Sequence, residues 1–494
     1  MRQTYILLLF TICLFSCQND APQSTATPSP FDQKNEAFEK DLAILKDHFN
    51  IPGMAACVIK DDQVAFEKYM GYADVEAKTP VDENTLFPIA SLTKIYSATM
   101  IMKLVEEGKL SLDDPIEKYY PGLPVQEPIQ VKHLLSHTSQ GKVGEHFYYS
   151  GRFALLKEVI AQSANVSGAD YLKETIIKPL NLENTLALTN DSLVNDRFAK
   201  PYYYDEAGKI ETGFSPAAGI VSNLKDMITF NAALESNQLI SEQSKNKMFQ
   251  PFKEGLPYGL GIFTQKYQGV TMIWAYGQYD CYSSLFLKIP GKRHTLILLA
   301  NNNLMSDPAR LIYGDASYSL FVHSFLKNYI FDQPKLDILL DVDSLNSQDF
   351  DTELTRDKLL AQALASSFLA RYDDQQYYDS KKALEAVFTQ HPDYLDYGDL
   401  SLLHNLTFLK TVAANKMLEA SNEFDEQIEQ IGLKLLEEDP DNPYVRIYLG
   451  GYYDSIGDDK NAQVHYEQVA NPQNFSTNWY TIEARNWLKS KGIQ

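Results

Sequence analysis

Cysteine is scarce in this chain of 494 residues, which contains only 4: Cys13, Cys17, Cys57 and Cys281. So few cysteines exclude a disulfide-stabilised scaffold. Cys57 and Cys281 lie in apolar or strand-like stretches, so we expect both to be buried free thiols. No cluster of His, Cys, Asp and Glu has metal-ligand spacing either, and the sequence predicts neither a metal nor another cofactor.

Positive charge is also in short supply. The chain has 44 Lys and Arg against 65 Asp and Glu, a formal net charge of −21. A surface of this sign disfavours nucleic acid and anionic lipid head groups as partners.

Long hydrophobic runs are limited to the N-terminus, where Arg2 precedes an apolar stretch over residues 5–15. This stretch is too short to cross a bilayer comfortably, so residues 1–16 are predicted to be a signal peptide. Ser16 before Cys17 resembles the lipobox of bacterial lipoproteins, in which the cysteine is lipidated and becomes the mature N-terminus. The alternative is an ordinary secretory signal with an incidental cysteine.

The segment over residues 17–35 is rich in Pro, Ser, Thr, Ala and Gln, a composition typical of a flexible tether. We therefore expect an exported, membrane-anchored lipoprotein, at the outer membrane and facing either the periplasm or the surface.

Residues 36–334 alternate helical and strand patterns. Helices are expected at 38–49, 91–107, 131–135 and 153–164, with a closing helix at 307–329. A hairpin is expected at 53–60 and 63–69, and strands at 272–274, 283–288 and 295–300. This order favours an α+β fold, an antiparallel sheet flanked by helices, over a βαβ pattern.

Strand signals disappear in the last part of the chain, residues 355–494, which is predicted to be a separate all-α domain. Helical patterns cover residues 359–372, 381–389 and 425–438. Residues 443–475 resemble a tetratricopeptide repeat, with small and large residues at its key positions: Leu449, Gly450, Tyr453, Gly457, Ala462 and Tyr466. The alternative is a generic helical bundle. Such repeats often bind other proteins, so we expect this domain either to dock a protein partner or to pack against the first domain.

The most informative motif is Ser91 followed three residues later by Lys94, at an expected helix start. Residues i and i+3 share one helix face, so the lysine amine can lie beside the serine hydroxyl and activate it as a nucleophile. The spacing alone is weak, because Ser222 and Ser244 are also followed by lysine three residues on. The alternative is a helix N-cap beside a solvated lysine.

Further segments support the reactive serine. Residues 104–115, 129–139 and 217–230 together with the Ser91 motif resemble the serine β-lactamase-like superfamily, which includes class C β-lactamases, D-Ala-D-Ala peptidases and related esterases. The resemblance covers about residues 38–330. It implies an antiparallel sheet flanked by helices, a helical insertion, and an active site between them.

The resemblance implies roles for further residues. In the second family motif, Tyr-x-Asn, the register of the following helix places Tyr148 at the catalytic base and Ser150 at the asparagine. A shift of one residue selects Tyr149 and Gly151 instead. His137 is expected to be structural.

The third family motif is Lys-Thr-Gly or His-x-Gly, and here it corresponds to Ala275, Tyr276 and Gly277. Gly277 would permit close approach of substrate, and the N–H groups of Gln278 and Ser91 would form the oxyanion hole. Tyr276 would contribute to the substrate pocket. Ala275 lacks the family's cation, which argues against β-lactam or D-Ala-D-Ala substrates unless Lys142 or Arg152 supplies the charge.

The sequence thus predicts a lipid-anchored serine hydrolase that transfers an acyl group through Ser91 from an ester, amide or peptide-like substrate. The alternative is a penicillin-binding-like scaffold or sensor that binds a ligand or partner without turnover.

Overall fold

The computed structural model describes residues 30–125, 127–204, 206–345, 353–392, 399–418, 422–470 and 478–493. The predicted signal peptide and Cys17 lie outside these residues. Within these ranges, no helix combines the length and apolar character needed to cross a membrane.

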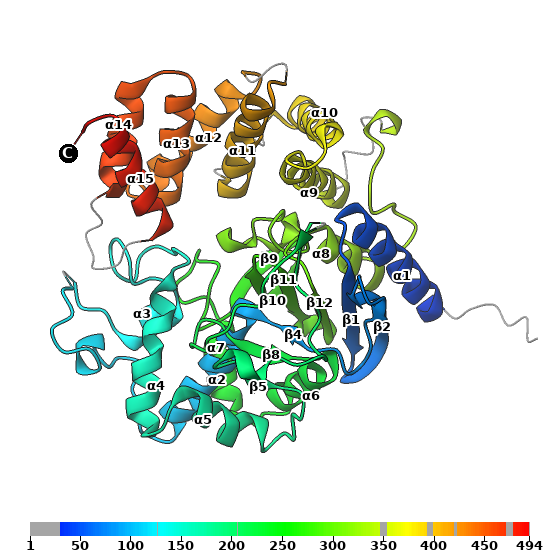
Figure 1. Cartoon of the computed structure of the whole chain (residues 1–494), viewed down its shortest axis with the longest axis vertical. Helices are drawn as coiled ribbons and strands as arrows, with labels where there is room; N and C mark the ends of the chain where they lie inside the picture. Colours follow the sequence, from blue (N-terminus) through cyan, green and yellow to red (C-terminus); the bar gives the residue numbers. More distant parts are fainter. Residues whose placement is uncertain are drawn as a thin grey trace, which may run out of the picture.

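A seven-stranded antiparallel sheet forms the centre of the first domain, with strand order β3-β2-β1-β12-β11-β10-β9 (Figure 1). The strands are β1 Gly53–Lys60, β2 Gln63–Asp74, β3 Thr79–Pro80, β9 Phe263–Tyr267, β10 Val270–Tyr279, β11 Tyr282–Ile289 and β12 His294–Ala300. The predicted antiparallel sheet is confirmed, and the expected strands near residues 273, 285 and 297 lie side by side within it.

Helices cover both faces of this sheet. Helix α1, Pro30–His48, packs with α8, Leu320–Phe325, on one face, while α2, Thr93–Glu106, and α6, Leu224–Glu235, lie on the other. Strand β1 is buried on both sides, because alternate residues join the two cores. Cys57 and Cys281 are buried and free, as predicted.

A mainly helical insertion lies between α2 and the short strand β8, Ile220–Ser222, which pairs with another short strand, β4 Phe87–Pro88. It contains α3 Val131–Leu135, α4 Leu156–Ala164, α5 Gly168–Leu172, β5 Leu186–Ala187, β6 Tyr202–Tyr203 and β7 Glu206–Ala207. Helix α7, Glu242–Phe249, follows α6. The insertion covers the sheet face that carries α2 (Figure 1).

Two predicted boundaries are wrong. Residues 30–35 belong to α1 rather than to a tether, because Phe31 packs on Tyr329 and the Asn35 side chain is hydrogen-bonded to Ala65 and Tyr329. The predicted helix at 307–329 begins only at Leu320, in α8. Arg310 at φ +50° and Gly314 at φ +96° interrupt a helix before that point.

In the described part of the C-terminal domain there are seven α-helices, α9 Glu353–Leu369, α10 Asp374–Gln390, α11 Leu400–Lys416, α12 Asp425–Glu438, α13 Pro443–Ser455, α14 Asp459–Ala470 and α15 Trp479–Ser490. They lie across one end of the first domain (Figure 1). Gly450 lets α13 approach α14, since a Cβ there would lie 3.0 Å from the Tyr466 ring. The all-helical character is confirmed, and the tetratricopeptide assignment stays a prediction.

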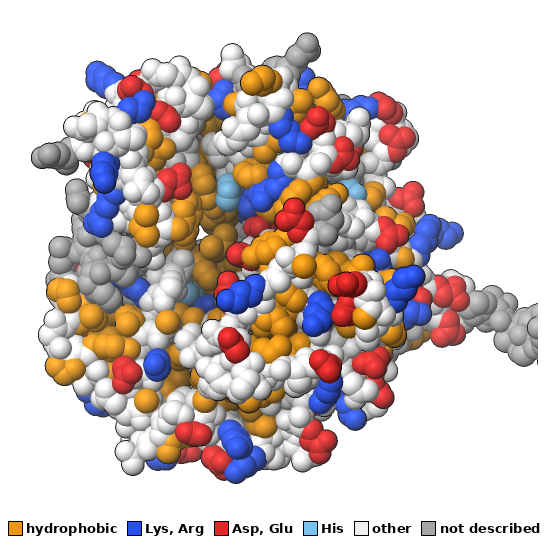
Figure 2. All heavy atoms as spheres, in the orientation of Figure 1, with side chains coloured by type: hydrophobic (Ala, Val, Ile, Leu, Met, Phe, Trp, Pro, Cys, Tyr) orange, Lys and Arg blue, Asp and Glu red, His pale blue; other side chains and the backbone are white. Residues whose placement is uncertain are grey.

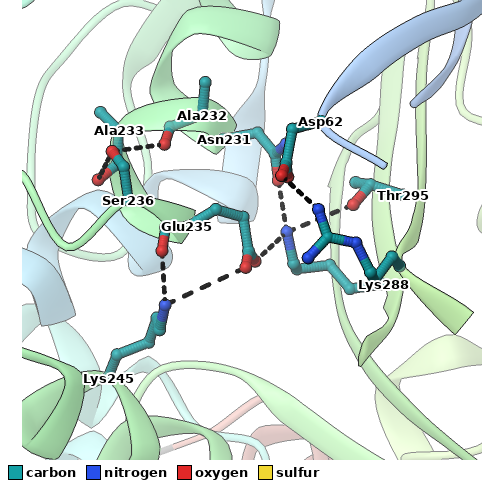
Figure 3. Close-up of polar contacts among 10 residues, drawn as sticks. Asp62, Asn231, Ala232, Ala233, Glu235, Ser236, Lys245, Lys288 and Thr295 are labelled. Atoms are coloured by element: carbon teal, nitrogen blue, oxygen red, sulfur yellow. Dashed lines mark hydrogen bonds and ion pairs between the residues drawn. The ribbon is translucent and has the colours of Figure 1, made fainter. Parts of the chain in front are cut away.

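A buried lysine joins α6 to the sheet (Figure 3). The Lys288 side chain, only 4% exposed, reaches from β11 to Glu235 with Nζ 2.5 Å from Oε1. It also donates to Asn231 and Thr295, at 2.5 and 3.2 Å. Burial lowers the Lys288 pKa, and Glu235 opposes this shift. Glu235 is partly exposed and also lies near Lys245.

We expect Glu235→Gln to destabilise the protein by about 1–3 kcal/mol at neutral pH, because it leaves a buried ammonium without a counter-ion. Lys288→Met should cost less, since the remaining Glu235 carboxylate reaches solvent. In Glu235→Gln, the pKa of Lys288 in the folded state falls further below its value in the unfolded state. The unfolded state then binds more protons than the folded state, so the stability of this variant rises with pH up to about 10. Urea unfolding at pH 7 and 9.5 measures both effects. A larger loss in Lys288→Met than in Glu235→Gln would contradict this account.

Candidate active site

Ser91 lies in a 3-10 turn, Ala90–Leu92, directly before α2, as the helix-start prediction requires. Three contacts hold this turn in place. The Ile89 carbonyl accepts hydrogen bonds from Ser284 Oγ of β11 and from the Leu92 N–H, and the Thr93 hydroxyl accepts one from the Ile220 N–H of β8. Ala90 has φ +47°, an uncommon conformation for a residue with a side chain. The fold therefore over-determines the backbone at the serine.

Lys94 lies one turn into the same helical segment and is only 4% exposed. Its Nζ lies 2.9 Å from Ser91 Oγ and 3.1 Å from the Ala217 carbonyl oxygen. The amine also lies 4.8 and 5.4 Å from the ring centroids of Tyr149 and Phe153. The structure thus brings the predicted serine and lysine together and adds an aromatic wall around the amine.

The two candidate tyrosines point in different directions. Tyr149 packs against Lys94 and lines the cavity that contains Ser91. The buried Tyr148 donates its hydroxyl to Asp439 of the helical domain at 2.5 Å. Burial and this carboxylate raise the Tyr148 pKa. The predicted placement of Tyr148 beside the serine is therefore wrong, and Tyr149 occupies that position.

A cavity of about 300 Å³ opens above the serine. Its walls include Ser91, Tyr149, Tyr276 and Gln278, four of the residues proposed from the sequence. The 3-10 turn with Ser91 packs against β10, which supplies Tyr276 and Gln278. Figure 2 shows a hollow between the helical domain above and the first domain below, with mainly hydrophobic walls and basic side chains beside it.

Comparison with known proteins matches the Beta-lactamase family model to residues 38–318, which include the whole Ser91 motif and the sheet. The chain belongs to the Beta-lactamase family. This family assignment makes it a serine acyl-transferase or hydrolase of the β-lactamase fold.

Individual relatives agree with this family. Penicillin-binding protein 4* of Bacillus subtilis is 27% identical over 335 residues, 56% of this chain and 73% of that protein. The putative penicillin-binding protein PbpX of the same species is 26% identical over 298 residues, covering 50% and 74% of the two chains. A solved structure, the octameric penicillin-binding protein homologue from Pyrococcus abyssi, has the same fold, with a TM-score of 0.53 at 24% identity, over 61% of this chain and 78% of that chain.

The second family motif departs from its pattern in this chain. Ser150 does not line the cavity; its hydroxyl caps the next helical turn by accepting from the Arg152 N–H at 3.1 Å. The predicted contact of Ser150 with substrate is therefore not supported. The register of Tyr149 places Gly151 at the asparagine position, and Gly151 has open space where a side chain would project.

His137 supports Tyr149 from behind. The two rings stack with centroids 4.3 Å apart, and His137 Nδ1 accepts from the Ser150 N–H at 3.0 Å. Burial and the nearby Lys94 hold the pKa of His137 well below its usual value. A neutral, fully buried imidazole of this kind is structural, as expected.

The third motif is also altered. Gly277 is required by packing, because a Cβ there would lie 2.0 Å from the Ile89 carbonyl oxygen and 2.4 Å from Ser284 Oγ. Gly277 therefore allows the serine turn to pack closely against β10, whereas the sequence predicts that it allows close approach of the substrate. Ala275 is buried in the core and brings no charge. Arg152 does not line the cavity, and its guanidinium donates to the Ser139 carbonyl instead. Lys142 is exposed and does not line it either.

Sequence reasoning missed the other eight residues that line the cavity, which include Arg310, His404, Tyr448 and Trp479. Arg310 comes from the segment after β12, and His404, Tyr448 and Trp479 come from helices α11, α13 and α15 of the C-terminal domain. Nothing in the local sequence relates these helices to a serine located more than 300 residues earlier. The sequence predicts that residues 307–310 belong to a regular helix, and a residue at that place gave no reason to assign Arg310 to the cavity.

The helical domain also anchors the loop that carries Tyr149. Tyr444 of α13 donates its hydroxyl to the Tyr149 carbonyl at 2.7 Å. Tyr480 of α15 donates to the Gln140 side chain at 2.9 Å. Together with the bond between Tyr148 and Asp439, these contacts hold the loop at both ends.

Proposed function

We propose that this chain is a serine hydrolase that forms an acyl-enzyme at Ser91 with an ester, amide or peptide-like substrate. One observation carries the proposal, the 2.9 Å separation of Lys94 Nζ and Ser91 Oγ at the edge of an open cavity. A merely capping serine beside a solvated lysine would have neither a buried amine nor a cavity.

The proposed reaction has two steps. Ser91 Oγ attacks the carbonyl carbon while its proton passes to the Lys94 and Tyr149 pair, which then protonates the leaving group. Water next attacks the acyl carbonyl carbon and its proton passes to the same pair. The bond between this carbon and Ser91 Oγ then breaks, the pair returns the proton to Oγ, and the carboxylic acid leaves. The N–H groups of Ser91 and Gln278 are proposed to stabilise the oxyanion in both steps.

Burst kinetics tests this proposal. We expect 4-nitrophenyl butyrate to give a burst of nitrophenol close to one equivalent of enzyme, followed by slower turnover. Ser91→Ala should abolish both phases while retaining the thermal unfolding midpoint. If wild-type protein shows neither burst nor turnover with esters, amides or a fluorescent penicillin, the chain is a binding protein and the hydrolase proposal fails. A penicillin adduct stable for hours would indicate a sensor.

We also propose, from the sequence alone, that the protein is exported and lipid-anchored through Cys17 at the outer membrane. A protein partner for the helical domain likewise stays a proposal. Labelling of cells with an alkyne fatty acid checks the anchor: Cys17→Ser should lose the label and leave the membrane fraction. Retained label in Cys17→Ser would refute lipidation at this residue.

A further inference from the structure

The catalytic cavity is closed on one side by the helical domain. His404, Tyr448 and Trp479 face Ser91, Tyr149 and Gln278 across it. A hydrogen-bonded network fixes this wall to the first domain. The Tyr313 hydroxyl lies 2.8 Å from His404 Nδ1 and is also hydrogen-bonded to the Tyr448 hydroxyl, which lies 3.0 Å from the same nitrogen. The helical domain is therefore hydrogen-bonded to the first domain at the cavity and forms one of the cavity walls.

A second cavity adjoins the first. It measures about 260 Å³ and lies among α11, α13 and α15. It shares the lining residues His404, Tyr448 and Trp479 with the catalytic cavity, so these three side chains border both cavities. The further walls combine aromatic faces with polar groups: Thr407, Phe408, Lys410, Thr411, Tyr452, Ser455 and Glu483. We call this second cavity the helical groove.

Arg310 lines the catalytic cavity and packs against Phe408, which lines the helical groove. Its side chain is 7% exposed, and only one nitrogen, Nη1, has a partner among the described residues, Asp307 Oδ1 at 3.2 Å. Nε and Nη2 are buried and have no hydrogen-bond partner in the described part of the chain. The guanidinium carbon lies 4.9 and 5.2 Å from the ring centroids of Phe368 and Phe408, which belong to α9 and α11.

Unpaired buried N–H groups are costly, and a guanidinium fork matches a carboxylate in geometry and charge. Asp307 alone leaves two of the three guanidinium nitrogens unsatisfied. An anionic group on a ligand in the cavity would pair with them and would be held between the aromatic rings of the helical domain.

We propose that the catalytic cavity and the helical groove form one composite binding site for an elongated anionic acyl substrate. Its anionic group binds Arg310, and its chain passes Tyr448 and Trp479 into the groove. This inference rests on the proposed function, because it assigns the substrate of the Ser91 reaction. The helical domain is then a specificity element of the hydrolase.

Four 4-nitrophenyl esters test the composite site in the full-length protein: short and long acyl chains, each neutral or carrying a carboxylate close to the ester carbonyl, within reach of Arg310 in the catalytic cavity. We expect the long anionic ester to have the highest kcat/KM. Trp479→Ala should lower kcat/KM at least about tenfold more for long esters than for short ones. Arg310→Gln should lower it at least about tenfold more for anionic esters than for neutral ones.

Ile482→Ala is the matched control for Trp479→Ala. Ile482 lies on the same helix, is 51% exposed against 47% for Trp479, and lines neither cavity. It should leave all four values unchanged, and thermal unfolding checks that each variant is folded. Equal losses for all esters in Trp479→Ala and Arg310→Gln, or a wild-type preference for short neutral esters, would overturn the inference.

Binding separates this inference from the hydrolase proposal. In the Ser91→Ala background, calorimetry with the free long-chain dicarboxylic acid should detect binding that is lost on adding Arg310→Gln or Trp479→Ala. Binding without any reaction at Ser91 would refute the hydrolase and retain the composite site. Reaction at Ser91 with no such binding and no ester preference would retain the hydrolase and refute the composite site.

Discussion

Replacing Lys94 with methionine is expected to lower the rate of Ser91 acylation by about 10²–10⁴-fold, because it removes the group that exchanges a proton with Oγ. Methionine fills a similar volume, and Lys94 is buried among apolar residues, so the fold should persist. The measurement is the pseudo-first-order rate of reaction with a fluorophosphonate. Lys103→Met, on the same helix but partly exposed, is the control and should react at the wild-type rate. A Lys94→Met rate within about threefold of wild type would remove the lysine from the mechanism.

The adjacent tyrosines should give opposite results when each is changed to phenylalanine. Tyr149→Phe is expected to lower kcat by about 10²–10⁴-fold, because it removes the hydroxyl proposed to share proton transfer with Lys94. Stability should be nearly unchanged, because the ring that contacts Lys94 and lines the cavity is kept. Tyr148→Phe should retain most activity and lose about 1–3 kcal/mol of stability, because it removes a hydrogen bond to the Asp439 carboxylate.

Both tyrosine variants are measured by steady-state ester hydrolysis and urea unfolding. The two variants differ from wild type by one oxygen each, so each serves as the control for the other. A severe loss of kcat in Tyr148→Phe, with normal kcat in Tyr149→Phe, would restore the register that the sequence favoured.

The sequence was sufficient for the serine centre because its signals are local. Ser91 and Lys94 share a helix face, and the strands of the sheet have strong apolar patterns with short turns between them. These features predicted the proximity of Ser91 and Lys94 and the antiparallel sheet, and the structure contains both.

The tyrosine register depends on a distant contact. Tyr148 and Tyr149 have similar local surroundings, and Asp439, the residue that draws Tyr148 away from the serine, lies 291 positions later. The helix after them can be counted back in two ways, because it begins with a 3-10 turn, Gly151–Leu155, rather than with regular α-helix. No local pattern could have decided between the two.

The residues that the helical domain contributes to the cavity could not be predicted from the sequence for a similar reason. His404, Tyr448 and Trp479 belong to helices whose periodicity predicts secondary structure but not docking partners. Arg310 was placed on a regular helix, whereas positive φ values at Arg310 and Gly314 turn the chain toward the cavity. Tertiary packing, rather than propensity, determines these positions.

The second and third family motifs are altered in this chain, and other residues of the cavity supply different groups in their place. Ala275 carries no charge and Gly151 no amide, yet the cavity gains Arg310 and the aromatic wall of the helical domain. The chain thus keeps the Ser91 and Lys94 pair and has different groups around it. This combination is consistent with retained chemistry on a different substrate.

Peptide mapping by mass spectrometry after treatment with a fluorophosphonate tests the central claim most directly. The account predicts one covalent adduct, on the peptide containing Ser91, which is absent from Ser91→Ala and strongly slowed in Lys94→Met. An unmodified Ser91 in folded protein, or equal labelling of Ser222 or Ser244, whose sequence spacing to lysine is the same, would contradict it.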